Sequence, residues 1–218
     1  NLTDGAPQGG GLLVFNIDNG TAAIVTFSGT NKQINTNTAT GVNLQTNPNG
    51  TINFTNGGLD IDTTTGIGFN ATSGGTVNVT GANNTIDTTT GTAVNIANTT
   101  IGAGGVTFRS ISVNGAINGI VLNTTGGSGG LTVTGTGITA GSGGTIQNTT
   151  SDGVNVISAI LNLNNISLNT IGDDAVESLN STLNGAGNTT AGLGGLRFND
   201  LGGNSPLGGL EIDGLFFP

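Results

Sequence analysis

The side chains of this chain that could do chemistry are almost all aspartates. Asp62 and Asp87 lie 25 residues apart in the first half, and Asp152, Asp173 and Asp174 lie in the second. Carboxylates, together with turn carbonyls, are the oxygen ligands that Ca²⁺ prefers. These five aspartates are therefore the predicted calcium ligands, although the chain lacks the Gly-Gly-x-Gly-x-Asp repeat of calcium-binding β-rolls. No other cofactor is predicted.

Paired carboxylates could also act as a general acid and base. Asp152 precedes Asp173 by 21 residues, about one repeat of the chain, so Asp152 could stack on one member of the Asp173-Asp174 pair. Stacked carboxylates repel each other unless they are protonated or bridged by a cation. The competing interpretation is a solvated turn, in which aspartate is common.

Several kinds of chemistry are excluded by composition. The chain has no His and no Cys, which excludes Ser-His and Cys-His nucleophiles, disulfides and thiolate metal sites. Twelve acidic residues stand against only three basic ones, Lys32, Arg109 and Arg197, and the net charge is −9. With so few basic residues, the chain lacks the positive charge that would attract nucleic acid or an anionic membrane surface. We therefore predict no enzymatic activity, no nucleic-acid partner and no membrane insertion.

Threonine clusters at 63–65, 88–90 and 149–150 are another candidate surface. Stacked threonines are found on ice-binding β-helices, and carbohydrate-binding faces can look similar. Each cluster adjoins a glycine corner and does not fill a strand, so outward-facing β-branched residues of a sheet are the simpler explanation.

The C-terminal stretch contains the apolar residues Leu215, Phe216 and Phe217, and its two phenylalanines are among only eight in the chain. An open end of a β-structure exposes unpaired backbone and needs a cover. These residues could plug the last coil of their own chain, dock onto the next subunit of a head-to-tail filament, or mark a boundary within a longer adhesin. Residues 1–10 contain Gly and Pro, and we expect them to be loosely ordered.

The elements that position these side chains follow an internal repeat. A Thr/Asn/Asp cluster is followed by Gly and then by a strand in which apolar and polar residues alternate. The anchoring glycines Gly41, Gly66, Gly91, Gly119 and Gly153 follow one another at intervals of 25, 25, 28 and 34 residues. No segment shows the 3.6-residue period of a helix, so the repeats are built from strands.

A repeat of about 20–30 residues predicts an all-β fold, a right-handed parallel β-helix forming one domain over 11–218 with irregular C-terminal coils. An antiparallel β-sandwich is the alternative fold, but a sandwich does not require the sequence to repeat one motif in the same order. The apolar residues expected to face inward in the clearest coils are Ile52, Phe54, Leu59, Ile61, Ile67, Phe69, Val77, Val79, Ile86, Val94 and Ile96.

Two stretches carry a family resemblance. Gly126-Gly-Ser-Gly-Gly-Leu-Thr-Val-Thr-Gly-Thr-Gly and Gly143-Gly-Thr-Ile-Gln-Asn-Thr-Thr-Ser-Asp-Gly-Val154 resemble the parallel β-helix-repeat exoproteins of bacteria, which are grouped with filamentous-haemagglutinin-like adhesins. The resemblance covers roughly residues 35–180 and rests on composition. It implies a secreted or cell-surface setting and a structural or adhesive role.

A narrower resemblance concerns Ser151-Asp-Gly-Val-Asn-Val156 and Thr170-Ile-Gly-Asp-Asp-Ala-Val176. These segments are similar to the Asp-bearing coils of polygalacturonase-type glycosidases, which would place Asp152, Asp173 and Asp174 at acidic positions. The chain departs from that family because it has no His and only Arg197 downstream as a basic residue.

The sequence therefore predicts an extracellular structural or adhesive β-helix that forms a homo-oligomer or filament and contacts polysaccharide. The alternative is a carbohydrate-binding or degenerate glycoside-hydrolase-like β-helix.

Overall fold

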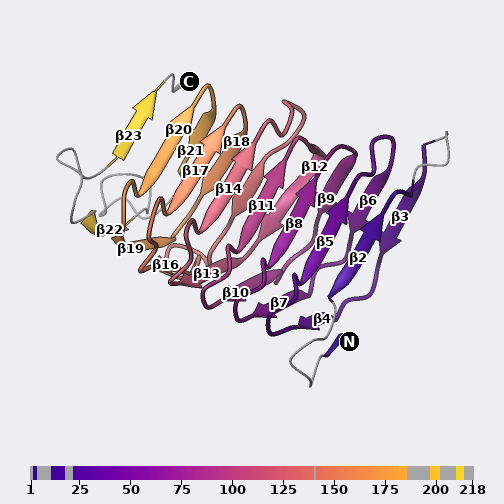
Figure 1. Cartoon of the computed structure of the whole chain (residues 1–218), viewed down its shortest axis with the longest axis horizontal. Coiled ribbons are helices and arrows are strands. Elements are labelled where there is room, and N and C mark those ends of the chain that lie inside the picture. The colour runs from indigo at the N-terminus through magenta and orange to yellow at the C-terminus, as the bar shows by residue number, and fades with distance from the viewer. Residues whose placement is uncertain are drawn as a thin grey trace.

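The protein is a parallel β-helix in which three sheets wind around one core (Figure 1). The computed structural model describes residues 2–3, 11–17, 22–139, 141–185, 197–201 and 210–213, and all regular elements among them are strands. The chain passes through sheets I, II and III in turn, and every strand pairing is parallel. The winding is right-handed, the usual hand for parallel strands joined by crossovers.

Sheet I contains eight strands: β1 (Leu2–Thr3), β4 (Lys32–Asn35), β7 (Leu59–Thr63), β10 (Thr85–Thr88), β13 (Ser110–Asn114), β16 (Thr145–Gln147), β19 (Ser167–Ile171) and β22 (Arg197–Leu201). Sheet II also contains eight: β2 (Leu12–Phe15), β5 (Val42–Gln45), β8 (Phe69–Thr72), β11 (Val94–Ala97), β14 (Ile120–Asn123), β17 (Val154–Ile157), β20 (Val176–Leu179) and β23 (Leu210–Asp213). Sheet III contains seven: β3 (Ile24–Phe27), β6 (Thr51–Phe54), β9 (Thr76–Val79), β12 (Thr100–Phe108), β15 (Leu131–Val133), β18 (Ile160–Leu163) and β21 (Thr182–Asn184).

The predicted β-helix is thus confirmed, and the sandwich alternative is wrong because no described strand pair is antiparallel. Coil length varies around the predicted range. Equivalent positions lie 25 residues apart between β7 and β10, 22 apart between β18 and β21, and 33 apart between β13 and β16. The longest coil carries the loop after β15, which ends at β16.

The core is formed by alternate residues of the strands, stacked rung on rung. Ile61, Ile86 and Ile111 are direct partners in sheet I, and all three are fully buried. Stacking like on like buries an apolar face that a single coil could not cover. All but one of the eleven residues predicted to face inward are buried; the exception is Ile67, which is half-buried in the turn before β8.

The corner between sheets II and III requires a left-handed backbone at one position. The residue immediately after each sheet II strand from β2 to β20 has a positive φ. These residues are Asn16, Thr46, Ser73, Asn98, Thr124, Ser158 and Asn180, with φ between 49° and 66°. Asn tolerates this conformation best among residues with a side chain, which explains part of the high Asn content.

The phase of the predicted repeat is wrong in two coils. Because Val42 pairs with Phe69 and Phe69 with Val94, the residues equivalent to Gly41 are Gly68 and Ala93, not Gly66 and Gly91. The later anchors Gly119 and Gly153 do share this position, since Ile120 pairs with both Val94 and Val154. The position is small because it backs onto sheet I; a Cβ on Gly41 would lie 2.6 Å from Ile61 Cγ2.

The predicted domain limits stay a prediction. Of the segment 1–10, only strand β1 lies within the described residues, and it extends sheet I. At the other end, β22 and β23 continue sheets I and II beyond residue 180.

Candidate functional site

Three of the predicted calcium ligands meet at the corner that leads into sheet II. Asp152 precedes β17, and Asp173 and Asp174 precede β20. Since Val154 pairs with Val176, Asp152 and Asp174 occupy the same position of successive coils. One carboxylate oxygen from each of the three lies within 4.8 Å of the others. The expected stacking of Asp152 on one member of the pair is therefore correct, and the member is Asp174.

The Asp152 carboxylate is already engaged by the protein. Asp152 is 6% exposed, and its Oδ2 accepts a hydrogen bond from Asn155 Nδ2 at 2.9 Å. Its Oδ1 accepts one from the Asp174 backbone N–H at 3.4 Å. Asn155 Nδ2 also donates to Glu177 Oε2. These bonds tie the acidic turn of one coil to that of the next.

This acidic turn can offer carboxylate oxygens to a hard cation. Asp173 is exposed and Asp174 only half-buried, an arrangement that solvated turns share. The calcium assignment therefore stays a prediction, to be checked by thermal unfolding with added Ca²⁺ in wild type and Asp152→Asn.

Asp62 and Asp87 form a separate group in the middle of sheet I. They are direct partners on β7 and β10, as their spacing predicted, and both face outward. Burial raises the pKa of the Asp62 carboxyl, and the charges of Asp60 and Asp87 raise it further. Burial also raises the pKa of Asp87; a hydrogen bond from Ser112 opposes that rise and Asp60 adds to it. The five predicted ligands thus divide between two sites.

Amide ladders on the outer faces are a feature that sequence analysis missed. On sheet II, Asn95 Nδ2 donates to Asn70 Oδ1 at 2.7 Å, and Asn70 Nδ2 donates to Asn43 Oδ1 at 2.8 Å. On sheet III, Asn78 Nδ2 donates to Asn53 Oδ1 at 2.9 Å. The signal was available in the sequence, because these asparagines recur with the coil period of 25 to 27 residues.

Only part of each threonine cluster reaches the surface. Thr63 and Thr88 are buried, and their hydroxyls donate to the carbonyls of Gly66 and Gly91, at 2.7 and 2.6 Å. Thr149 is also buried, and its hydroxyl donates to the Ser151 carbonyl. One threonine of each cluster therefore closes a turn and is not available to a ligand.

A polar groove lies at the corner between sheets III and I. Its walls are the turn at 81–83, Thr107, Arg109 and residues 134–137 of the loop after β15. The loop is held in place, since Asn165 Nδ2 donates to the Gly137 carbonyl at 3.0 Å and Thr136 N–H donates to Ser142 Oγ at 2.7 Å. Arg109 is exposed, and no hydrogen bond or ion pair of its guanidinium is found among the described residues.

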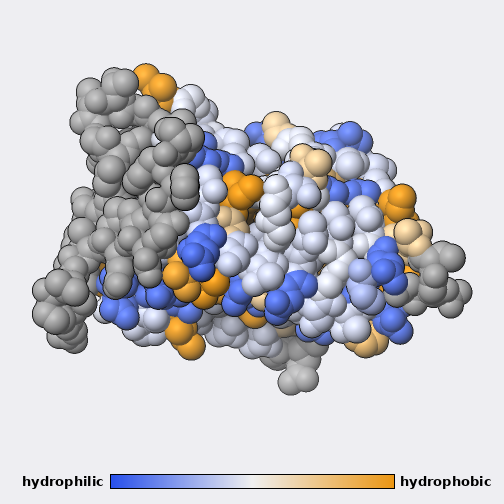
Figure 2. Space-filling model, turned by 90° about the horizontal axis from the view of Figure 1, so that it is seen from above, coloured by the Kyte–Doolittle hydropathy of each residue, from blue (hydrophilic) through white to orange (hydrophobic). Residues whose placement is uncertain are grey.

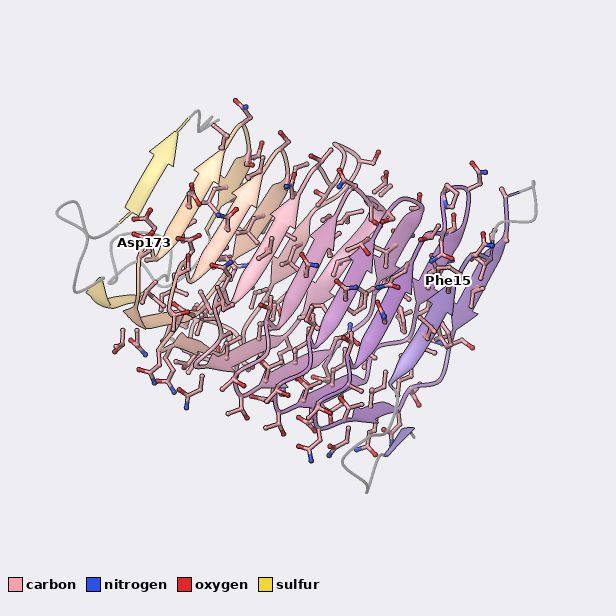
Figure 3. The ribbon with its side chains drawn as sticks, in the orientation of Figure 1. Phe15 and Asp173 are labelled. Atoms are coloured by element: carbon pink, nitrogen blue, oxygen red, sulfur yellow. The ribbon has the colours of Figure 1, made fainter. Side chains whose placement is uncertain are left out.

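The first coil presents an apolar surface that the sequence did not predict. Leu13, Phe15 and Ile24 are 61%, 56% and 70% exposed. Beside them, inward-facing residues of all three sheets line a hollow: Leu12 of sheet II, Phe27 of sheet III and Ile34 of sheet I. Figure 3 shows Phe15 in this first coil and Asp173 near the opposite end of the solenoid.

The remaining predictions concern residues that the structure covers little or not at all. Leu215, Phe216 and Phe217 lie outside the described residues. Arg197 lies in β22, of which only the backbone is described. The part of the chain that is described contains no helix with the length and apolar character needed to cross a bilayer.

Comparison of the chain with protein-family models, with curated proteins and with solved structures gave no match in any of the three cases.

Proposed function

We propose that this protein is an extracellular structural and adhesive β-helix whose copies stack end to end into a filament, sheath or surface fibre. The observation that carries the proposal is the continuity of the three sheets, each of which pairs strand to strand across the described coils. Such a solenoid adds length at a constant cross-section, and its strand edges at either end suit a further coil.

The outer surface supports a structural role. None of the seven strands of sheet III contains a charged residue, so that face presents mainly Thr and Asn. In Figure 2, the face shown is mostly hydrophilic or near-neutral, with isolated hydrophobic residues. A neutral surface of hydroxyl and amide groups suits contact with polysaccharide or with copies of the same chain.

Sedimentation velocity across micromolar concentrations tests the proposal. A structural protein that stacks end to end gives a series of increasingly elongated species as concentration rises. A single monomeric species throughout would contradict the self-assembly.

Carbohydrate binding in the Arg109 groove is the second candidate function. The groove combines an exposed guanidinium with threonine, asparagine and backbone groups, which together can bind sugar hydroxyls and a carboxylate. If it binds a glycan, Arg109→Gln lowers the affinity in a glycan-array or calorimetric assay. Lys32→Gln is the matched control, because Lys32 lies outside the groove and donates to the backbone carbonyl of Thr55. Equal binding by wild type and Arg109→Gln would remove this candidate.

The absence of catalysis belongs to the proposal as well. We expect no sugar release from pectin-like polysaccharides. Release that is lost in Asp173→Asn or Asp174→Asn would contradict a purely structural role.

A further inference from the structure

One corner between sheets III and I is much shorter than the corners of the coils beside it. Arg109 is the only residue between β12 and β13. In the two adjoining coils, residues 80–84 separate β9 from β10, and residues 134–144 separate β15 from β16. A short corner between two longer ones leaves a depression, and Arg109 and Thr107 lie in it. The polar groove is therefore a consequence of the lengths of three successive corners.

The groove is preformed, because hydrogen bonds hold Arg109 and both walls in place. The Arg109 N–H donates to the Asn84 carbonyl at 2.7 Å, and the Arg109 carbonyl accepts from the Gly135 N–H at 2.9 Å. The buried Asn165 amide of the next coil holds the loop through its bond to the Gly137 carbonyl. The space between the walls has a volume of about 460 Å³, within the range of roughly 300–1,000 Å³ that is common for small-ligand sites.

The guanidinium in this groove has no partner within the described part of the chain. Of the two basic side chains that the structure describes, Lys32 is used by the fold, since its Nζ donates to three backbone carbonyls. Arg109 is exposed and forms no such bond with any described residue. The charges that raise the pKa of Asp62 and Asp87 are those of other aspartates. The N–H donors of Arg109 are therefore available to a ligand.

The polar groups around Arg109 suit sugar hydroxyls. Asn83, Thr107 and Thr136 line the groove, and their side chains form no hydrogen bond with the residues that the structure describes. An amide and two hydroxyls offer both donors and acceptors. None of the described residues that line the groove is aromatic, so a sugar ring has no surface on which to stack. The charge of Arg109 is therefore the strongest interaction that the groove offers.

We propose that the Arg109 groove binds a carboxylate-bearing sugar, a uronate unit of an acidic polysaccharide. The guanidinium binds the carboxylate, and the threonine and asparagine side chains bind ring hydroxyls. A planar carboxylate matches two parallel N–H donors of a guanidinium. One positive charge in a chain of net charge −9 also suits a singly charged unit better than a phosphate, which carries more charge. The inference rests on carbohydrate binding, the second candidate function, and names the class of sugar.

Isothermal titration calorimetry with two matched sugars tests this assignment. The first probe is an oligoglucuronate with the linkage of cellulose, and the second is the cello-oligosaccharide of the same length. The two differ only in the carboxylate, which replaces the hydroxymethyl group. We expect the wild type to bind the oligoglucuronate about tenfold or more tightly than the neutral sugar, because hydrogen bonds to charged groups are the stronger ones.

Variants of Arg109 should remove this preference. Arg109→Gln should weaken oligoglucuronate binding by about tenfold or more and leave cello-oligosaccharide binding nearly unchanged. Arg109→Lys keeps the charge without the fork of donors and should restore only part of the preference. Lys32→Gln is the control, because it removes the same charge outside the groove and should leave both affinities unchanged. Circular dichroism should show the same fold in all three variants.

The hydroxyl contacts are measured separately. The double variant Asn83→Ala with Thr136→Ala changes exposed side chains on the two walls of the groove. It should weaken binding of both sugars by a similar factor and leave the ratio of their affinities unchanged. A ratio that changes as much as in Arg109→Gln would contradict the division between charge and hydroxyl contacts.

The outcomes separate this inference from the proposed function. Equal affinity of the wild type for the two sugars would overturn the acidic class and leave carbohydrate binding standing. A preference that persists in Arg109→Gln would overturn the groove as its site, and tighter binding of a sulfated cello-oligosaccharide would overturn the carboxylate. If none of the three probes binds, both this inference and the carbohydrate candidate fail, while end-to-end assembly is still judged by sedimentation alone.

Discussion

At the residue scale, the row Asn35, Asp62, Asp87 and Ser112 on sheet I departs from the amide ladders elsewhere. Two carboxylates are direct neighbours where sheets II and III place amides. An amide can both donate and accept within a ladder, whereas two carboxylates can only accept and repel each other. The raised pKa values of Asp62 and Asp87 agree with the unfavourable placement of two carboxylates side by side.

Replacing one of these acids should stabilise the protein. Because the pKa of Asp62 is raised in the folded state, its charge destabilises the fold at neutral pH, and this effect fades as pH falls toward the unfolded-state pKa. We expect Asp62→Asn to increase the free energy of unfolding by roughly 0.2 to 1 kcal/mol at neutral pH and to have little effect near pH ~4. Urea denaturation at the two pH values measures this.

The reverse change is the matched control. Asn35→Asp adds a third acid to the same row and should destabilise the protein at neutral pH. A loss of stability in Asp62→Asn at neutral pH would show that its carboxylate has a favourable partner.

A buried amide at the corner before β10 should contribute far more to the free energy of unfolding than an amide in an outer ladder. Asn84 is 1% exposed; its Oδ1 accepts from the Leu59 N–H at 2.9 Å, and its Nδ2 donates to the carbonyls of Thr107 and Gly81. Asn84→Ala removes these bonds to Leu59 and Thr107 of the adjoining coils and to Gly81 of its own turn. We expect a loss of about 2–4 kcal/mol in the free energy of unfolding.

Asn95→Ala provides the comparison, because Asn95 lies in the outer ladder, where water can replace the lost bond. Its expected cost is below about 1 kcal/mol. Equal losses in the two variants would mean that Asn84 does not join the coils as its three hydrogen bonds indicate.

Several residues of the candidate surfaces could not be predicted at this scale. Leu12-Leu-Val-Phe15 is a continuous apolar run, so alternation could not identify which side chains face outward. The pairing with Val42 to Gln45 settles the phase and places Leu13 and Phe15 outside. The Arg109 groove also depends on a loop whose path the sequence does not specify.

At the element scale, the strands and their parallel stacking were predictable because alternation and coil period agree. The phase of the repeat was not, since both Gly66 and Gly68 occur in one short segment. The choice between them depends on close packing against Ile86 of the next coil, which only the pairing of strands defines.

The residue with a positive φ after each sheet II strand leads to a prediction about stability. Thr46 is exposed and has a φ of 53°, which a β-branched residue adopts at a cost, while Asn16, Asn98 and Asn180 hold the equivalent position in other coils. Thr46→Asn should increase the free energy of unfolding by roughly 0.5–1 kcal/mol, measured by thermal or urea denaturation. Asn98→Thr, the reverse change in another coil, should cost a similar amount. No difference in either variant would mean that the corner tolerates β-branched residues without strain.

At the scale of the whole molecule, the account depends on how the solenoid ends. The middle coils are covered on both sides by coils like themselves, and their outward positions are mostly polar, with exceptions such as Val121 and Ile157. The first coil combines an open apolar hollow with exposed Leu13, Phe15 and Ile24, so it is the part of the described chain that is best suited to a protein contact.

Negative-stain electron microscopy of the purified chain at micromolar concentration tests the end-to-end assembly most directly. The account predicts unbranched filaments with the width of one solenoid, and predicts that Leu13→Asn with Phe15→Gln shortens or abolishes them. Short rods of uniform length at every concentration would contradict it, because they would show that the first coil is not a joint between copies.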